Sequence, residues 1–407
     1  MLDHALQLHY PSSTGAECPY PVYDYWRSEE PVYLIPGRHP ATFVVSRYED
    51  VRFVARHPEL FSSVHSRMGL NRFDFVGEGE AGVQTMLESD PPEARAKRDL
   101  AFAPLKPGRL REYAPWVEQI VDELIDGFAG RGSCDFVEEF ARPLPVRVMM
   151  RLFGIPGEFW PMLYEWSDLE ASGLSWLSPA QRDRQLCNAR RFGEFLTERV
   201  AQSHAEPGED VISEIIAAQV ARDGTFNAAE VRAQASVVLA GGAATTQHMM
   251  GGAMLLLIEH PEELARARAD LGRIPRILEE ATRIESSVQW VPRVVKEAVE
   301  IAGVTLPVGS YVLCMWGSAN RDPSRFEDPE RFDPDRPELM AHMAFGSGPH
   351  TCLGAPLARL EGRIAFERLL TRLGDLSVDP DTEIRHVESP SFRGLEHLHL
   401  RFTASPG

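Results

Sequence analysis

Residues Phe345–Gly354 place a cysteine directly before an expected helix, in the order Phe-Gly-Ser-Gly-Pro-His-Thr-Cys-Leu-Gly. Backbone N–H groups at a helix N-terminus stabilise an anion, so Cys352 is favoured as the thiolate that ligates metal. Gly346 and Gly354 permit tight turns and the close approach of a flat ligand, beside which Phe345 could pack. A small buried hydrophobic residue is the alternative role for this cysteine.

A second group of candidate residues lies inside a long apolar segment, Ala228–His260. Gly241 and Gly242 weaken the helix there and indicate a packing or ligand-binding reason. After two alanines, Thr245 and Thr246 place two adjacent hydroxyl groups in this segment. Alternatively, these threonines bond to carbonyl groups one turn back and bend the helix.

The elements that must position these residues are mostly helices. Apolar residues recur at helical spacing in Trp116–Phe128, Arg190–Val200, Ala228–His260, Glu262–Leu271, Pro275–Ile284 and Ala355–Leu373. Alternation typical of strands occurs in Val32–Leu34, Thr42–Val45, Val294–Ile301, Tyr311–Met315 and His397–Phe402. The sequence therefore predicts a mainly α fold with smaller β-sheets. No linker divides it, so we expect a single domain over residues 1–407.

Composition excludes several classes of function. The 407 residues carry a net charge of −18, which repels nucleic acid and anionic lipid. The segment Ala235–Ile258 is interrupted by polar residues, and Met1–Tyr10 holds no apolar run of signal length, so we expect no membrane anchor and a cytoplasmic location. Five scattered cysteines without C-x-x-C spacing argue against disulfides and structural zinc.

Three motifs resemble those of the cytochrome P450 family. Phe345–Gly354 matches the haem signature F-x-x-G-x-x-x-C-x-G at every fixed position. Glu280 and Arg283 match the E-x-x-R motif, which alone would be an ordinary surface pair. The segment around Arg336 resembles the family's meander, whose arginine joins that pair as a structural support. The resemblance implies the P450 fold, a triangular prism with haem b between the helix of Thr245 and the helix after Cys352.

The resemblance also assigns the cofactor contacts. Cys352 would be the axial ligand of the iron. Arg98, Arg293 and His350 would neutralise the haem propionates, and Ala94 stands where many members have histidine. The remaining surface around the haem would come from Phe345, Gly346, Gly354 and Gly241.

The segment Ala240–Thr246 departs from the family's A-G-x-[D/E]-T-[T/S] pattern. Thr245 and Thr246 match the threonine positions, but Ala244 replaces the acid that relays protons to bound oxygen. Water, Gln247, His248 or a substrate hydroxyl could substitute, or hydrogen peroxide could serve as the oxidant because it brings its own protons.

The implied function is a haem-thiolate monooxygenase that hydroxylates or O-demethylates a small hydrophobic substrate, such as an aromatic ether or a terpenoid. Ferredoxin and ferredoxin reductase would supply electrons through a basic patch near the cysteine. The alternatives are a haem-binding sensor or carrier without turnover and a cofactor-free helical binding protein. The patch would comprise Arg98, Arg109, Arg111, Arg359 and Arg363, and the substrate pocket Phe73, Phe75, Leu169, Leu174, Trp176, Val238, Trp290, Val291 and Phe392.

Overall fold

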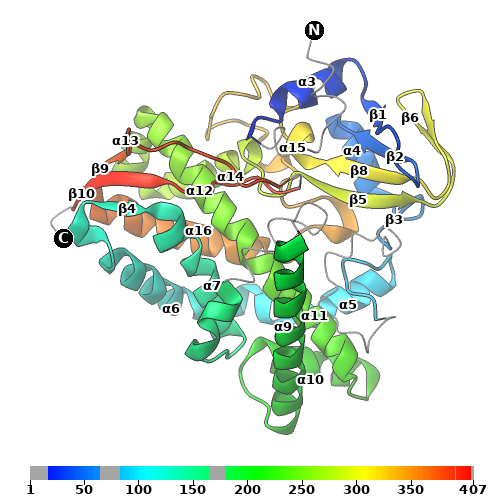
Figure 1. Cartoon of the computed structure of the whole chain (residues 1–407), viewed down its shortest axis with the longest axis horizontal. Coiled ribbons are helices and arrows are strands. Elements are labelled where there is room, and N and C mark those ends of the chain that lie inside the picture. The colour runs from blue at the N-terminus through cyan, green and yellow to red at the C-terminus, as the bar shows by residue number, and fades with distance from the viewer. Residues whose placement is uncertain (1–16, 65–82, 165–178, 390, 405–407) are drawn as a thin grey trace.

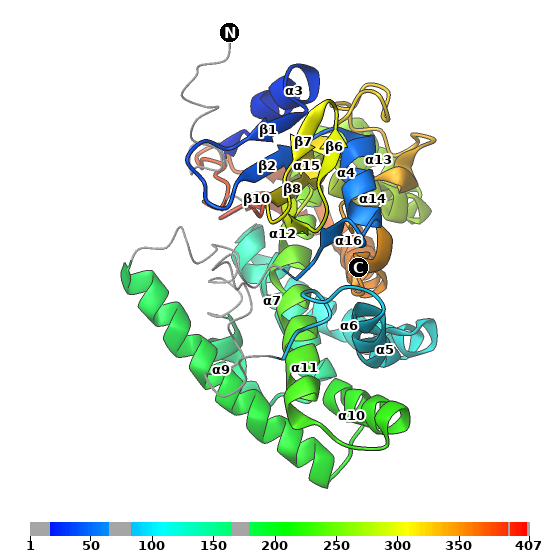
Figure 2. The ribbon, with the colours of Figure 1, turned by 90° about the vertical axis from the view of Figure 1, so that its right-hand side faces the viewer.

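The computed structural model describes residues 17–64, 83–164, 179–389 and 391–404. Helices dominate this part of the chain, and short strands form three small sheets (Figures 1 and 2), so the predicted fold class is confirmed. The main helices are α3 (Tyr20–Ser28), α4 (Tyr48–Arg56), α5 (Glu93–Phe102), α6 (Pro107–Asp126), α7 (Pro143–Leu152), α9 (Pro179–Ala205), α10 (Val211–Asp223), α11 (Ala228–Gly242), α12 (Ala244–Glu259), α13 (Pro261–Ala269), α14 (Ile274–Ile284), α15 (Trp316–Ala319) and α16 (Ala355–Arg372). The strands are β1 (Val32–Leu34), β2 (Thr42–Val45), β3 (Phe61–Ser62), β4 (Ser133–Asp135), β5 (Trp290–Val295), β6 (Val299–Ile301), β7 (Val304–Leu306), β8 (Tyr311–Met315), β9 (Leu373–Val378) and β10 (His399–Ala404).

The five-stranded sheet has the order β1-β2-β8-β5-β3, with β2 parallel to β8 and the other pairs antiparallel. Every residue of β8 is buried, and successive side chains point to opposite faces. Val312 and Cys314 pack with apolar residues of α4, whereas Leu313 and Met315 pack with those of α3. The sheet is therefore covered on both faces, which explains the unbroken apolar run of this strand.

Residues 290–301 form two strands where the sequence predicted one, Val294–Ile301. β5 ends at Val295, and the N–H of Lys296 then donates to the carbonyl oxygen of Leu60 at 2.8 Å. β6 pairs with β7 in a separate hairpin. The prediction was wrong because the apolar alternation continues across a bend that these local hydrogen bonds impose.

The largest apolar core lies in the helical body and draws on α6, α7, α11, α12, α14 and α16. α12 is buried on almost every side, as expected for a helix that is apolar all round. Figure 2 shows α11 and α12 running in line through the centre, between the five-stranded sheet and the helices α9 and α10. Within the described ranges, no helix combines the length and the apolar composition needed to cross a membrane.

The segment predicted as one helix, Ala228–His260, is interrupted at Ala243, which has φ −89° and ψ −76° and separates α11 from α12. Two glycines before this residue lower the helix propensity. The hydroxyl of Thr245 also donates to the carbonyl oxygen of Gly241 at 2.8 Å, in competition with the backbone. The interruption lies at the residues for which chemistry was predicted.

Candidate functional site

Cys352 lies in a tight loop just before α16. Its N–H donates to the carbonyl oxygen of Phe345 at 2.7 Å, which closes the loop. Gly346 and Gly348 have φ of +76° and +75°, values that glycine adopts without strain. A Cβ atom at Gly348 would also lie 2.6 Å from the carbonyl oxygen of Ala55 in α4. The loop thus requires glycine at this position and is packed firmly against α4.

The Cys352 side chain is accessible to a small ligand, although protein atoms surround it closely. This burial raises the pKa of the thiol. The N–H groups of Gly354 and Ala355 and the positive charges of Arg98 and Arg359 act in the opposite direction and lower the pKa. Four groups that favour negative charge therefore converge on one sulfur, and a bound metal cation would add to them.

Arg98 and Arg293 are two of the basic residues predicted to face the cofactor. Arg98 lies in α5, close enough to Cys352 for their charges to interact. Arg293 is 6% exposed, donates to the carbonyl oxygen of Pro292 at 2.7 Å, and has no carboxylate partner among the described residues. Burial lowers the pKa of Arg293. The carboxylate of Asp90 acts on this charge without forming a direct ion pair. A buried guanidinium without a directly paired anion is costly, so this position fits the carboxylate of a ligand.

His350, the third basic residue, is half-buried and is oriented by a chain of hydrogen bonds. Its Nε2 lies 3.0 Å from the hydroxyl oxygen of Ser63. Asp90 accepts from the N–H of Ser63 at 2.8 Å and from the hydroxyl of Ser62 at 2.7 Å. Ala94 is buried four residues after Asp90 and carries no charge, so it adds no basic group here.

Gly241 and Gly242 meet different surroundings. A Cβ atom at Gly242 would lie 2.6 Å from the sulfur of Met149 in α7. A Cβ atom at Gly241 would meet no atom of the described chain within 4 Å. One glycine therefore lets α11 approach α7, and the other leaves open space beside Thr245.

The residues after the helix break are tied to distant segments. Ala244 and Thr246 are buried, and Thr245 is half-buried. Ser287 donates its hydroxyl to the carbonyl oxygen of Thr245 at 2.9 Å, and its own carbonyl oxygen accepts from the N–H of Arg393 at 2.9 Å. The loop before β10 therefore helps to position the threonine.

His248 lies one turn after Thr245 and is 2% exposed. Neither ring nitrogen has a hydrogen-bond partner among the described residues. The ring packs so tightly on the backbone of Gly394 that a Cβ atom there would overlap it, and its centroid lies 6.3 Å from that of Phe392. Burial and the nearby His386 lower the pKa of His248 to about 4, so the imidazole is neutral at pH 7.

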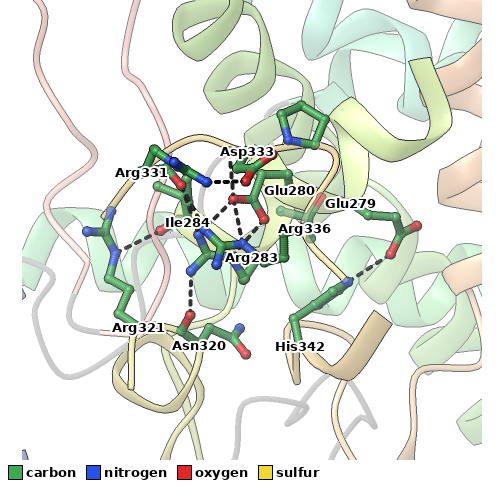
Figure 3. Close-up of polar contacts among 12 residues, drawn as sticks. Glu279, Glu280, Arg283, Ile284, Asn320, Arg321, Arg331, Asp333, Arg336 and His342 are labelled. Carbon is green, nitrogen blue, oxygen red and sulfur yellow. Dashed lines mark hydrogen bonds and ion pairs between the residues drawn. The ribbon is translucent and has the colours of Figure 1, made fainter. Parts of the chain in front are cut away.

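Glu280 is fully buried and accepts hydrogen bonds from two arginines (Figure 3). Arg283 donates through Nε and Nη2, both at 2.8 Å, and Arg336 donates through Nε at 3.1 Å. The N–H of Asp333 donates at 3.0 Å, and Arg283 also reaches the carbonyl oxygen of Asn320 at 2.8 Å. The network fastens the segment 320–336 to α14.

The predicted pocket residues are only partly described. Val238 and Val291 are half-buried, and Phe392 is 8% exposed. Trp290 instead packs with α3 and β1 in the core beneath the sheet, so we reassign it to the core because β5 turns this side chain towards α3. The remaining five lie outside the described residues: Phe73, Phe75, Leu169, Leu174 and Trp176.

A model of the family described as cytochrome P450 matches residues 176–396. The chain is 35% identical over 317 residues to 6-deoxyerythronolide B hydroxylase of Saccharopolyspora erythraea, covering 78% of this chain and 77% of the relative. The solved structure of CYP109Q5 from Chondromyces apiculatus matches with a TM-score of 0.86, 33% identity and 97% coverage of both chains. CYP109E1 from Bacillus megaterium, solved with testosterone, matches with a TM-score of 0.85 and 28% identity, covering 96% of this chain and 99% of that one.

The chain therefore belongs to the cytochrome P450 family. It has the fold of that family, it is a cytochrome P450 monooxygenase, and its cofactor is haem b, which the family binds through a cysteine thiolate. The family resemblance inferred from the motifs is confirmed. The two non-enzymatic alternatives, a haem carrier and a cofactor-free helical protein, are set aside.

Proposed function

We propose that Cys352 is the axial ligand of the haem iron and that the whole chain serves as one P450 domain. The observation that carries this proposal is the thiol at the start of α16, towards which the N–H groups of Gly354 and Ala355 are directed. Arg98 and Arg293 support it, since both are partly or fully removed from water and lack an ion-pair partner among the described residues. When bound, haem with a thiolate ligand activates oxygen for insertion into a C–H bond.

The remaining residues of the proposed cofactor site act through shape. A Cβ atom at Gly354 would lie 3.9 Å from the sulfur of Cys352, and one at Gly346 would lie 3.4 Å from the carbonyl oxygen of His350. A Cβ atom at Gly241 would meet no atom of the described residues within 4 Å, so this glycine leaves open space beside α11. Phe345 packs under the guanidinium of Arg359, with the charge 4.5 Å from the ring centroid. His350, held by Ser63, would donate to a propionate.

The carbon monoxide difference spectrum of the reduced protein tests the ligand. A cysteine ligand gives a band near ~450 nm, and Cys352→Ala should abolish it. Cys187→Ala, which alters an exposed cysteine, should leave the band unchanged and serves as the control. A band of normal intensity in Cys352→Ala would refute the assignment.

We infer that the substrate is a hydrophobic molecule larger than the aromatic ethers and terpenoids that the sequence suggested. The support is the relatives, one named for 6-deoxyerythronolide B and one solved with testosterone. Val238, Val291 and Phe392 would supply apolar surface. Testosterone, 6-deoxyerythronolide B and a methoxyarene should be compared by their shift of the haem towards high spin. Hydroxylation gives an alcohol, whereas O-demethylation would also release formaldehyde, so the products distinguish the two reactions. A spin-state shift that occurs only with the methoxyarene would overturn the inference of a larger substrate.

We propose that Ala244 makes proton delivery from protein side chains inefficient and leaves hydrogen peroxide as an effective oxidant. The hydroxyl of Thr245 is engaged, because it donates a hydrogen bond to the carbonyl oxygen of Gly241, and Thr246 is buried beside it. His248 is neutral because burial lowers its pKa to about 4, so it is not a charged proton donor at pH 7.

Restoring the acid tests this reasoning. Ala244→Asp should increase product formed per electron pair with oxygen and reduce the advantage of peroxide. Ala244→Asn has the same shape but does not titrate, so it is the matched control. Equal behaviour of the two variants would show that protons are not the cause.

We propose that an acidic ferredoxin, reduced by ferredoxin reductase, docks on a cleft of about 370 Å³ next to the start of α16. Arg111 is exposed at its edge. Arg359 binds Glu279 at 2.5 Å, and Arg363 pairs within its own helix, so both are partly neutralised. Arg109, also predicted for the patch, pairs with a glutamate of α10 at 2.5 Å instead. The cleft is lined by Leu110, Arg111, Ala114, Pro275, Leu278, Glu279, Pro356, Arg359, Leu360 and Arg363.

Charge reversal tests this docking surface. Arg111→Glu should raise the KM for ferredoxin, most strongly at low salt, and leave peroxide-driven turnover unchanged. Arg385→Glu, an exposed arginine outside the cleft, is the control. Equal KM values for the two variants would contradict the assignment.

A further inference from the structure

We propose a second metal site, suited to Zn²⁺, made by Asp135, His397 and His399 on the small sheet β4-β10-β9. Each residue offers one donor atom, and these atoms lie within 4.8 Å of one another. The sheet lies in Figure 1 at the end of the molecule opposite the five-stranded sheet. The site uses none of the residues assigned to haem.

Strand pairing brings the three side chains together. His399 stands directly opposite Asp135 in the antiparallel pair β10-β4, so their side chains share a face of the sheet. His397 lies two residues before β10 begins, and the contact of its Nδ1 with Oδ2 of Asp135 places it on the same face. Leu398 and Leu400, the alternate residues, are each 1% exposed and point into the core. The two histidines and the aspartate are therefore on the outer face.

Hydrogen bonds orient the donors before any metal arrives. Asp135 accepts the N–H groups of Val137 at 3.1 Å and Leu398 at 3.2 Å through Oδ1. Its Oδ2 lies 2.6 Å from Nδ1 of His397. The rings of His397 and His399 are nearly parallel, at 14°, with centroids 5.8 Å apart. One carboxylate oxygen is thus fixed by the backbone, and the other is directed at an imidazole.

The geometry needs only a small adjustment to hold an ion. Ligand atoms about 2.1 Å from a tetrahedral Zn²⁺ lie about 3.4 Å from each other. The Asp135–His397 contact would therefore open by about 1 Å as the metal replaces the shared proton. The side chain of His397 is 54% exposed and free to make this movement.

The chemistry of the donors selects the ion. Two imidazole nitrogens and one carboxylate oxygen suit zinc and leave a fourth position for water. Glu139 lies nearby, because its Oε1 accepts the N–H of Asp135 at 3.0 Å, and its charge is compensated by an ion pair between its Oε2 and Arg131. Arg401, the next outward residue of β10, is held by Asp379 at 2.7 Å and Asp381 at 2.8 Å, so its charge is compensated.

The consequence of metal binding would be structural. The ion would clamp the C-terminal strand β10 to β4. Asp135 also accepts from the first residue of the helical turn Val137–Ala141, which packs on α12. Because the ion would bind the folded state and not the unfolded chain, zinc would raise the thermal stability of the protein.

Titration of the full-length, haem-loaded and chelator-washed protein with zinc sulfate tests the site, with a chromophoric chelator as competitor. Wild type should bind one zinc ion per chain, and His397→Ala and His399→Ala should each weaken binding at least tenfold. His204→Ala, which removes an exposed histidine of α9, should not change it. Zinc should raise the unfolding midpoint of wild type and of His204→Ala only.

Both histidine variants leave Asp135 in place, so its contacts to the backbone and the fold are expected to survive. X-ray absorption at the zinc edge should show nitrogen and oxygen ligands with the scattering of two imidazoles. Equal affinity of wild type and both histidine variants, or the absence of saturable binding, would overturn the proposal.

Discussion

Arg336→Ala should destabilise the protein far more than Arg331→Ala, although both arginines lie in the same segment (Figure 3). Arg336 is 3% exposed and donates to Glu280 at 3.1 Å and to the carbonyl oxygens of Glu327 at 2.5 Å and Arg331 at 3.0 Å. The side chain of Arg331 is 63% exposed and pairs with Asp333 at 2.5 Å. The two variants remove the same side chain from a buried and an exposed position.

The structure sets the expected size of the effect. Breaking a buried ion pair by removing one partner costs about 3–5 kcal/mol. Glu280 keeps Arg283 and the N–H of Asp333, so its charge stays compensated and we expect the lower end, about 3 kcal/mol. Loss of an exposed pair costs about 0–1 kcal/mol. Arg336→Lys keeps the charge but loses the planar fork and should fall between the two alanine variants.

Urea unfolding of the haem-loaded protein measures this difference through tryptophan fluorescence and the Soret band. Arg336→Ala should lower the free energy of unfolding and release haem at a lower urea concentration than Arg331→Ala. If the two alanine variants unfold within about 1 kcal/mol of each other, the buried network does not hold the segment 320–336 on α14, and the reasoning fails.

Three further predictions concern the buried side of α11 and α12. Gly394→Ala should cost about 1–3 kcal/mol in urea unfolding, because the new methyl group overlaps His248, and His248→Ala in the same chain should recover most of it. The pKa of His248 is lowered from 6.5 to about 4 in the folded protein, so between these pH values the unfolded chain binds a proton that the folded protein does not. The free energy of unfolding therefore falls as the pH drops from 6.5 to about 4. His248→Asn should remove this component, at most about 3 kcal/mol, from unfolding curves measured across that range. Gly242→Ala should destabilise through its contact with Met149, and Met149→Ala should relieve it; no relief would contradict the packing seen at this glycine.

The cysteine loop could be predicted because its determinants are adjacent in the chain: the glycines, Phe345 and Cys352 all lie within ten residues. The contact of Arg336 with Glu280 spans 56 residues and was expected only through the family resemblance. The interruption at Ala243 was missed because the apolar periodicity continues across this residue. The hydrogen bond from Thr245 to the carbonyl oxygen of Gly241, which accompanies the break, leaves no mark on that periodicity.

Other features depend on contacts that no local pattern carries. Asp135 and His397 are 262 residues apart and meet only because β10 pairs with β4. The spacing of His397 and His399 in an expected strand indicated two of the three proposed ligands. It did not indicate that Asp135 would be the third. The burial of His248 against Gly394 likewise depends on a loop that packs on α12 from far along the chain.

Three consecutive residues, Phe392, Arg393 and Gly394, link the proposed pocket to α12. Phe392 would contact substrate, the N–H of Arg393 binds the carbonyl oxygen of Ser287, and Gly394 packs on His248. Ser287 in turn donates its hydroxyl to the carbonyl oxygen of Thr245. The segment that carries Phe392 is therefore linked to the first turn of α12 at two points, through Ser287 to Thr245 and directly to His248, next to Ala244, which replaces the usual acid.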